Sequence, residues 1–80
     1  MNWRERISID PDIHHGEPCI KGTRVPVSVI VGSIADGDTP PQIIDAWPQL
    51  TVDDIRAALK FAAEAVSNAD FVPLYGVGGK

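Results

Sequence analysis

The stretch 39–66 constrains the fold of this chain most, because it contains two helix-start signals separated by a short break. In the first signal Thr39 is an N-cap and Gln42 stands three residues later, which is the capping-box pattern, with proline between them at the first helical position. Pro48 ends this helix, because the residue before a proline is driven out of the α region. The sequence therefore predicts a short helix before Pro48 and another helix soon after it.

The second helix has its N-cap at Thr51, with Asp54 three residues later and with Leu50 and Ile55 in the positions of a hydrophobic staple. Apolar residues then recur at helical spacing, and charged residues take the other face. The apolar positions are Val52, Ile55, Leu59, Ala62, Ala63 and Val66, and the charged ones are Asp53, Arg56, Lys60 and Glu64. Two capped helices joined by so short a turn predict a helix-turn-helix corner.

Short β-strands are predicted near the N-terminus. Ile7 and Ile9 alternate within the segment ERISI and can share the buried face of one strand. Residues 18–20 and 23–25 flank a Lys21-Gly22 turn in which the glycine supplies a positive φ, and this pattern predicts a β-hairpin. Strands this short are marginal alone and need a helix or another chain to cover them.

One more helix is predicted between the strands and the corner. Pro26 fixes φ at its start, and Gly37 is a natural stop after it. Gly32 inside this helix costs up to about 1 kcal/mol relative to alanine, and a close approach of another helix would explain it. The expected fold class is mainly α with short β, a three-helix helix-turn-helix bundle preceded by a short N-terminal strand and a β-hairpin. The predicted helices are 26–36, 40–47 and 52–68; residues 1–68 form the folded unit and residues 69–80 an apolar C-terminal tail.

The composition limits the class of protein. Eighty residues make one domain, and no apolar run is long enough to span a bilayer, so no membrane partner is expected. The N-terminus lacks the apolar stretch of a signal peptide, and the one cysteine, Cys19, cannot form an internal disulfide, so a cytoplasmic location is expected. Cys19 is predicted to be a small buried strand residue, and Trp47 is predicted to lie in the core. Trp3 is either a tether to the core or an exposed contact.

The charge argues against strong nonspecific DNA binding by a monomer, because the net charge is −4 and the pI is near 4.8. Local contacts to phosphate remain open, and the candidate DNA-binding residues are Lys21, Arg24, Arg56 and Lys60. The second helix of the corner would be the recognition helix, but its first turn carries Asp53 and Asp54, which repel phosphate. A major-groove reader is therefore not favoured.

Enzymatic and metal chemistry find little support in the sequence. It contains no phosphate-binding glycine motif and no nucleophile elbow, and Cys19 beside His14 or His15 lacks the third group of a catalytic set. Two adjacent histidines and one cysteine do not fill a four-ligand zinc site. We expect no enzymatic activity, no cofactor and no metal.

Four segments resemble the domain of unknown function 433 family. They are I-S-I-D-P-D at 7–12, G-E-P-C-I-K-G-T-R-V-P-V at 16–27, S-V-I-V-G-S-I-A-D-G at 28–37 and T-P-P-Q-I-I-D-A-W-P-Q-L-T-V-D-D-I-R-A-A-L-K-F-A at 39–62. Members of that family are regarded as VapB-like antitoxins, encoded beside small nucleases of the PIN-like type, with a helix-turn-helix bundle preceded by short strands. The resemblance implies a non-catalytic protein that neutralises such a toxin and can bind operator DNA as a homodimer.

The resemblance carries functional residues over only at the G-T-R-x-P motif. Gly22, Thr23 and Pro26 of this motif have structural explanations, so Arg24 carries most of the functional expectation. Antitoxins generally reach their toxin through a segment beyond the DNA-binding domain, and this analogy assigns partner binding to four residues of the tail. They are Phe71, Pro73, Leu74 and Tyr75. The alternative is a small helix-turn-helix transcriptional regulator, with DNA as its main partner and the tail packed on the core.

Overall fold

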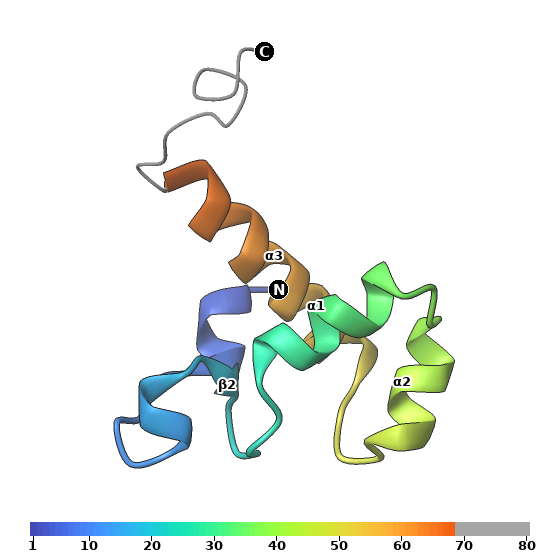
Figure 1. Ribbon diagram of the computed structural model, residues 1–80, viewed down its shortest axis with the longest axis horizontal. Helices are drawn as coiled ribbons and strands as arrows, with labels where there is room; N and C mark the ends of the chain where they lie inside the picture. The colour runs from blue at the N-terminus through green and yellow to red at the C-terminus, as the bar shows by residue number, and fades with distance from the viewer. Residues whose placement is uncertain (69–80) are drawn as a thin grey trace, which may run out of the picture.

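The computed structural model describes residues 1–68 as three helices preceded by a small antiparallel sheet. The elements are η1 (Trp3–Arg6), β1 (Ile7–Ser8), η2 (His14–Gly16), β2 (Cys19–Ile20), α1 (Val27–Ala35), α2 (Pro40–Ala46) and α3 (Val52–Asn68). β1 pairs with β2, with Ile7 opposite Ile20 and Ser8 opposite Cys19. α1 and η1 both pack against α3, whose C-terminal half rises above the other elements (Figure 1). The predicted fold class is confirmed.

Both predicted helix starts are made by the predicted side chains. The N–H of Thr39 donates to Oε1 of Gln42 at 2.8 Å, and Thr39 Oγ1 accepts from the N–H of Gln42 at 3.4 Å. At α3 the N–H of Thr51 donates to Oδ2 of Asp54 at 2.9 Å, and Thr51 Oγ1 accepts from the N–H of Asp54 at 3.2 Å. Because each capping box satisfies two otherwise unpaired backbone donors, α2 and α3 begin where the sequence places them.

The core lies where α1, α2 and α3 meet the small sheet. Its buried members come from β2, the three helices and the loops that precede α1 and α3. They are Ile20, Val25, Val27, Ile30, Ile43, Leu50, Ile55 and Ala58. Cys19 is buried as predicted. Burying an isoleucine or leucine side chain of this kind stabilises the fold by about 1.5–3 kcal/mol, so these few side chains dominate the stability of so small a domain.

The strand predictions hold in part. The first strand begins at Ile7 and not two residues earlier, because Trp3–Arg6 forms a 3₁₀ turn in which the Asn2 side chain accepts from the N–H of Arg4. The prediction that Ile9 shares a buried face with Ile7 is wrong: the strand ends at Ser8, and Ile9 is 61% exposed.

The predicted hairpin keeps its turn but not its second strand. Residues 23–25 form no regular strand, and they meet β2 through the N–H of Ile20, which donates to the carbonyl of Val25 at 3.0 Å. An isolated bridge between Cys19 and Pro26 extends this contact. The strand that pairs regularly with β2 is the predicted N-terminal strand, β1.

The predicted apolar stripe of α3 is buried only in part: Ile55 is buried as predicted, but most of the other positions are exposed. Val52, Leu59 and Val66 are 46%, 38% and 63% exposed, and Ala63 is also exposed. The buried positions of α3 are Asp54, Ile55, Ala57 and Ala58. Because α1 and η1 pack against α3, the buried face combines Ile55 with Asp54, Ala57 and Ala58, which the apolar period does not select.

Two single-residue predictions are wrong. Trp47 is 37% exposed at the end of α2, because Ile43 is the residue that α2 buries in the core. A Cβ at Gly32 would meet nothing within 4 Å, so no helix of residues 1–68 approaches closely there. None of the helices that the structure describes is both long and apolar enough to cross a bilayer.

Candidate functional site

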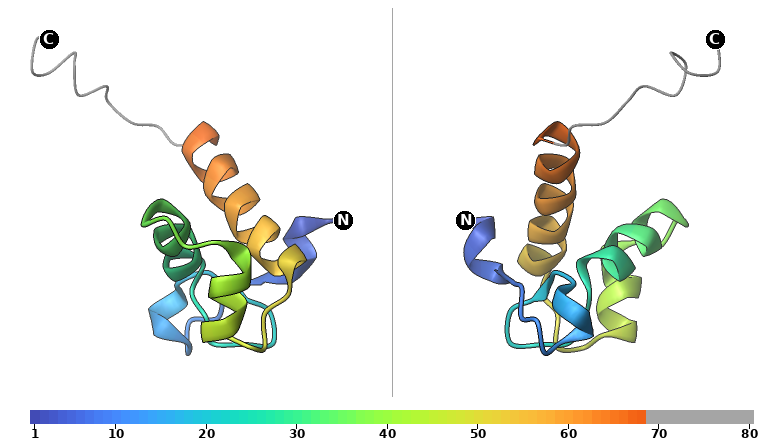
Figure 2. Two further views of the ribbon diagram at one scale, coloured as in Figure 1. Left: turned by 90° about the vertical axis from the view of Figure 1, so that its right-hand side faces the viewer. Right: turned by 60° about the vertical axis from the view of Figure 1, so that its left-hand side comes forward.

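The N-terminal turn of α3 is tied to the N-terminal segment by Arg6. Its Nη1 lies 3.0 Å from Oδ1 of Asp54, and its Nη2 lies 3.6 Å from Oδ2 of Asp53. The Asp54 side chain is only 10% exposed, and its other oxygen accepts the N–H of Thr51. η1 runs alongside this part of α3 (Figure 2, right). The turn that would enter a DNA groove is therefore acidic, internally paired and flanked by η1.

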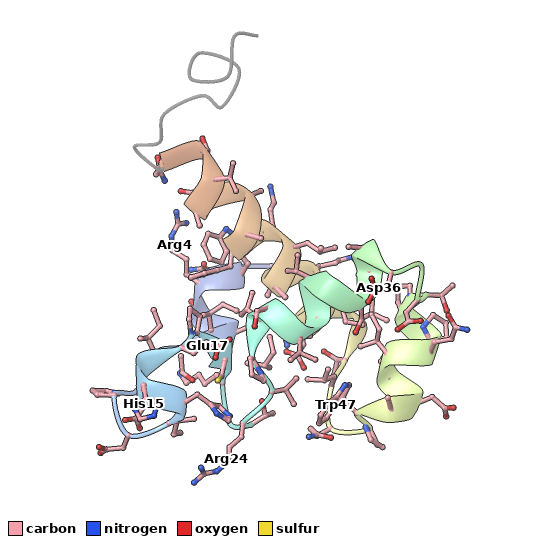
Figure 3. The ribbon with its side chains drawn as sticks, in the orientation of Figure 1. Arg4, His15, Glu17, Arg24, Asp36 and Trp47 are labelled. Atoms are coloured by element: carbon pink, nitrogen blue, oxygen red, sulfur yellow. The ribbon has the colours of Figure 1, made fainter. Side chains whose placement is uncertain are left out.

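The four predicted DNA-binding residues lie in two places. Lys21 and Arg24 are exposed on the turn between β2 and α1 and line one hollow together. Arg24 extends away from the body of the domain (Figure 3). Arg56 and Lys60 stand on α3 outside this hollow, and Arg56 is paired with Asp53 at 3.8 Å. The structure thus brings together the first two residues and separates them from the other two.

The G-T-R-x-P motif builds a rigid turn. Gly22 has a φ of +80°, a conformation that glycine adopts without strain. The Thr23 hydroxyl donates to the carbonyl of Ile20 at 2.7 Å and accepts the N–H of Val25 at 3.0 Å. Pro26 is the N-cap residue of α1. Three residues of the motif thus serve the fold, whereas the Arg24 side chain projects outward.

An apolar surface surrounds Phe61 on the second half of α3. Phe61 lines three hollows, of about 290, 370 and 150 Å³. We call this the Phe61 surface, and its apolar members are Trp3, Ile7, Ile9, Pro18, Val27, Val31, Phe61, Ala62 and Ala65. Trp3 meets Phe61 edge-on, with ring centroids 6.1 Å apart at 85°, so Trp3 is the tether that was one of its two predicted roles.

Sequence reasoning missed Arg6, Phe61 and the two polar residues that complete the hollow at the turn, Ser8 and Gln49. Arg6 stands within a segment predicted as strand, where nothing in the pattern selects a partner 48 residues away. Phe61 had a usable signal, because Ala58, Phe61 and Ala65 form a second apolar line along the helix.

Cys19 is poorly suited to nucleophilic chemistry. Burial raises the pKa of its thiol, the carboxylate of Glu17 raises that pKa further, and Arg24 acts against them. The thiol also donates to the carbonyl of Glu17 at 3.4 Å. A thiol with a raised pKa is a weak nucleophile at neutral pH. Within residues 1–68 no group of three or more potential metal-ligating side chains occurs. The predicted partner-binding residues Phe71, Pro73, Leu74 and Tyr75 lie outside the described residues.

The chain is similar to known proteins in sequence and in fold. The uncharacterized protein y4eO of Sinorhizobium fredii (strain NBRC 101917 / NGR234) is 41% identical over 59 residues, which are 74% of this chain and 27% of that protein. The chain thus spans about a quarter of the length of this relative. The crystal structure of a DUF433 member from Anabaena variabilis ATCC 29413 superposes with a TM-score of 0.72 at 27% identity, covering 78% of this chain and 61% of the other. The family described as "Protein of unknown function (DUF433)" matches residues 7–62, and the chain belongs to this family.

Proposed function

We propose that this protein is a non-catalytic, antitoxin-like interaction protein that binds and neutralises a small nuclease of the PIN-like type. The observation that supports this proposal is the Phe61 surface, which holds an aromatic anchor between three apolar hollows. Partly exposed aromatic side chains beside apolar hollows are frequent anchors of protein–protein contacts. The nature of the partner comes from the family resemblance.

The polar residues at the rim of the Phe61 surface suit a protein partner. Arg4 pairs with Glu64 at 2.8 Å on one side, and Glu17 accepts a hydrogen bond from the Ser28 hydroxyl on the other. An apolar centre with a polar rim is the usual anatomy of a protein–protein interface. The acidic first turn of α3 supports the same choice, since it is poorly suited to reading DNA bases.

A homodimer is part of the proposal. Val52, Leu59, Ala63 and Val66 are exposed along one face of α3, and three of them stand seven residues apart. A seven-residue apolar repeat is the pattern by which helices pair. We call these four residues the α3 stripe, and we propose that it pairs with the same face of a second copy.

A second candidate function, a small transcriptional regulator, is favoured by Lys21 and Arg24, the two exposed cations that line one hollow at the turn between β2 and α1. It differs from the first in its main partner. The regulator requires DNA binding that is independent of a nuclease, whereas the antitoxin requires inhibition of a nuclease whether or not DNA is bound.

The test is a nuclease-treated pull-down from the native host with the tagged full chain. Ala65→Arg places a charge on the Phe61 surface, and Ser67→Arg is the matched control, since both positions are exposed on the same turn of α3. We expect a small nuclease-like protein with the parent chain and with the control, but not with Ala65→Arg. Addition of the purified chain in equimolar amount should abolish the cleavage of RNA by that protein.

A chain truncated after Asn68 tests the predicted tail contacts separately. If the nuclease is captured by the full chain and lost with the truncated chain, the tail assignment is supported. If the truncated chain still captures the nuclease, the tail residues are not the contact, and the Phe61 surface remains the proposed binding site. If no nuclease is captured or inhibited by the full chain, the antitoxin proposal is wrong.

A further inference from the structure

The Lys and Arg side chains of residues 1–68 divide into those that form an ion pair with a carboxylate and those that do not. Arg4, Arg6 and Arg56 each have a carboxylate oxygen within 4.0 Å. No carboxylate of residues 1–68 lies within that distance of Lys21 or Arg24, and the same holds for Lys60. Lys21 and Arg24 therefore stand on one turn, and neither forms an ion pair with a carboxylate of residues 1–68.

Lys21 and Arg24 open onto a hollow that joins three distant parts of the chain. The hollow has a volume of about 630 Å³ and lies between the 21–24 turn, Ser8 at the end of β1 and Gln49 in the α2–α3 turn. We call it the turn hollow. The Ser8 hydroxyl and the Gln49 amide supply neutral hydrogen-bond donors beside the two cations. Its one acidic lining residue, Asp10, already accepts the N–H of Asp12 at 2.9 Å. The lining therefore carries a net positive charge on a protein that is acidic overall.

The turn that carries the cations is held rigidly. Ile20 and Val25, on either side of it, are buried, and the N–H of Ile20 donates to the carbonyl of Val25 at 3.0 Å. The N–H of Lys21 donates to the carbonyl of Arg6 at 2.8 Å, which fixes the turn to the segment before β1. A rigid backbone limits the conformational entropy lost on binding to that of the two exposed side chains, because the turn itself is already ordered.

The donor set suits a phosphodiester. A guanidinium makes paired hydrogen bonds to phosphate oxygens, an ammonium adds a point charge, and hydroxyl and amide groups complete such contacts in protein–DNA interfaces. The first turn of α3 offers the opposite charge, because Asp53 and Asp54 stand there. We infer that the turn hollow binds a backbone phosphate of duplex DNA, so that DNA meets the 21–24 turn and Gln49 and not the start of α3.

This inference deepens the second candidate function, the DNA-binding regulator, and it rests on that candidate alone. It adds Ser8 and Gln49 to the site and removes Arg56 and Lys60 from it. A phosphate contact fixes position on the duplex but reads no sequence. The turn hollow therefore predicts binding that depends strongly on salt and weakly on the sequence of the duplex.

The test is fluorescence anisotropy of a labelled mixed-sequence duplex titrated with the full chain over a series of salt concentrations. Arg24→Ala and Lys21→Ala should each weaken binding several-fold at low salt and reduce the slope of log affinity against log salt by about 1. Gln49→Ala should weaken binding less and leave the slope unchanged, because it removes a neutral donor. Lys60→Ala is the matched control, an exposed cation outside the hollow with no carboxylate of residues 1–68 within 4.0 Å, and it should leave affinity and slope unchanged.

Three results would overturn the inference: no binding of the duplex at low ionic strength, a loss in Lys60→Ala as large as that in Arg24→Ala, or saturation by inorganic phosphate as tight as by the duplex. The third result would mean that the hollow binds a small phosphate ligand. Phosphate binding is measured by NMR, from the changes in the backbone amide shifts of Gly22 and Arg24 as phosphate is added. The nuclease pull-down with Arg24→Ala separates this inference from the protein partner, because that variant leaves the Phe61 surface unchanged.

Discussion

Arg6 and Asp54, 48 positions apart in the sequence, form the ion pair that joins the N-terminal segment to the start of α3, with Nη1 and Oδ1 3.0 Å apart. Asp54 caps α3 with its other oxygen, so one carboxylate serves both the helix start and the tertiary contact. Removing Arg6 leaves that largely buried carboxylate without its cation.

Arg6→Ala should lower the free energy of unfolding by about 1–2 kcal/mol, a value reduced from that of a fully buried pair because Arg6 is partly exposed to solvent. Urea unfolding followed by circular dichroism measures the loss. Arg56→Ala is the control, because its pair with Asp53 is exposed and spans one helical turn; the loss there should be at most about 0.5 kcal/mol. Equal losses in the two variants would show that the Arg6–Asp54 pair stabilises the fold no more than an exposed ion pair does.

Two glycine substitutions should change stability in opposite directions. Gly22→Ala should destabilise by about 1 kcal/mol or more, because φ is +80° there and the added Cβ meets no neighbour that could compensate. Gly32→Ala should stabilise by about 0.5–1 kcal/mol, because the position lies inside α1 in open space. Thermal unfolding of both variants checks the signs, and a destabilised Gly32→Ala would mean that a partner chain approaches α1.

The stability of the protein should fall with rising pH through the titration of Cys19. Burial raises the pKa of the folded thiol, while the unfolded thiol keeps an ordinary value of about 8.5. The unfolded state therefore loses its proton first as the pH rises, so the contribution is complete below about pH 8.5 and is lost as the pH rises through the folded value. Cys19→Ala should show a smaller drop in unfolding free energy between pH 7 and higher pH than the parent chain in parallel urea titrations. An identical drop in the two chains would show that other groups cause it.

The same thiol should react slowly in the folded protein. Cys19 is buried, and its raised pKa keeps the reactive thiolate scarce at neutral pH. Alkylation by a maleimide, followed by mass spectrometry, should proceed much more slowly in native buffer than in urea. Rapid native labelling would mean that β2 opens readily.

Leu59→Glu should dissociate the proposed homodimer without unfolding the chain. Leu59 is 38% exposed in the α3 stripe, so a carboxylate there is tolerated in a monomer but becomes buried when two stripes pair. Light scattering coupled to size exclusion measures the mass, and circular dichroism confirms the helix. Lys60→Glu, the neighbouring exposed position outside the stripe, is the control and should remain dimeric. A parent chain that is monomeric at high concentration would reject the stripe as a dimer contact.

The sequence by itself determined the elements that depend on neighbours three or four positions away. Thr39 with Gln42 and Thr51 with Asp54 begin two helices through hydrogen bonds that span three residues, and Gly22 with Thr23 closes the turn in the same local way. These contacts are short in sequence, so side-chain chemistry and spacing suffice to predict them. The helix-turn-helix corner and the site of the basic turn follow from them.

Only the tertiary structure decided which surfaces these elements present. The apolar period of α3 selects Ile55 together with Val52, Leu59 and Val66, yet packing against η1 and α1 buries Ile55 and leaves the other three exposed. The same packing brings Trp3 onto Phe61 and Gln49 beside the 21–24 turn. Each outcome depends on where segments distant in sequence settle, since a helix with apolar residues on more than one face can bury any of them, and the larger total burial decides.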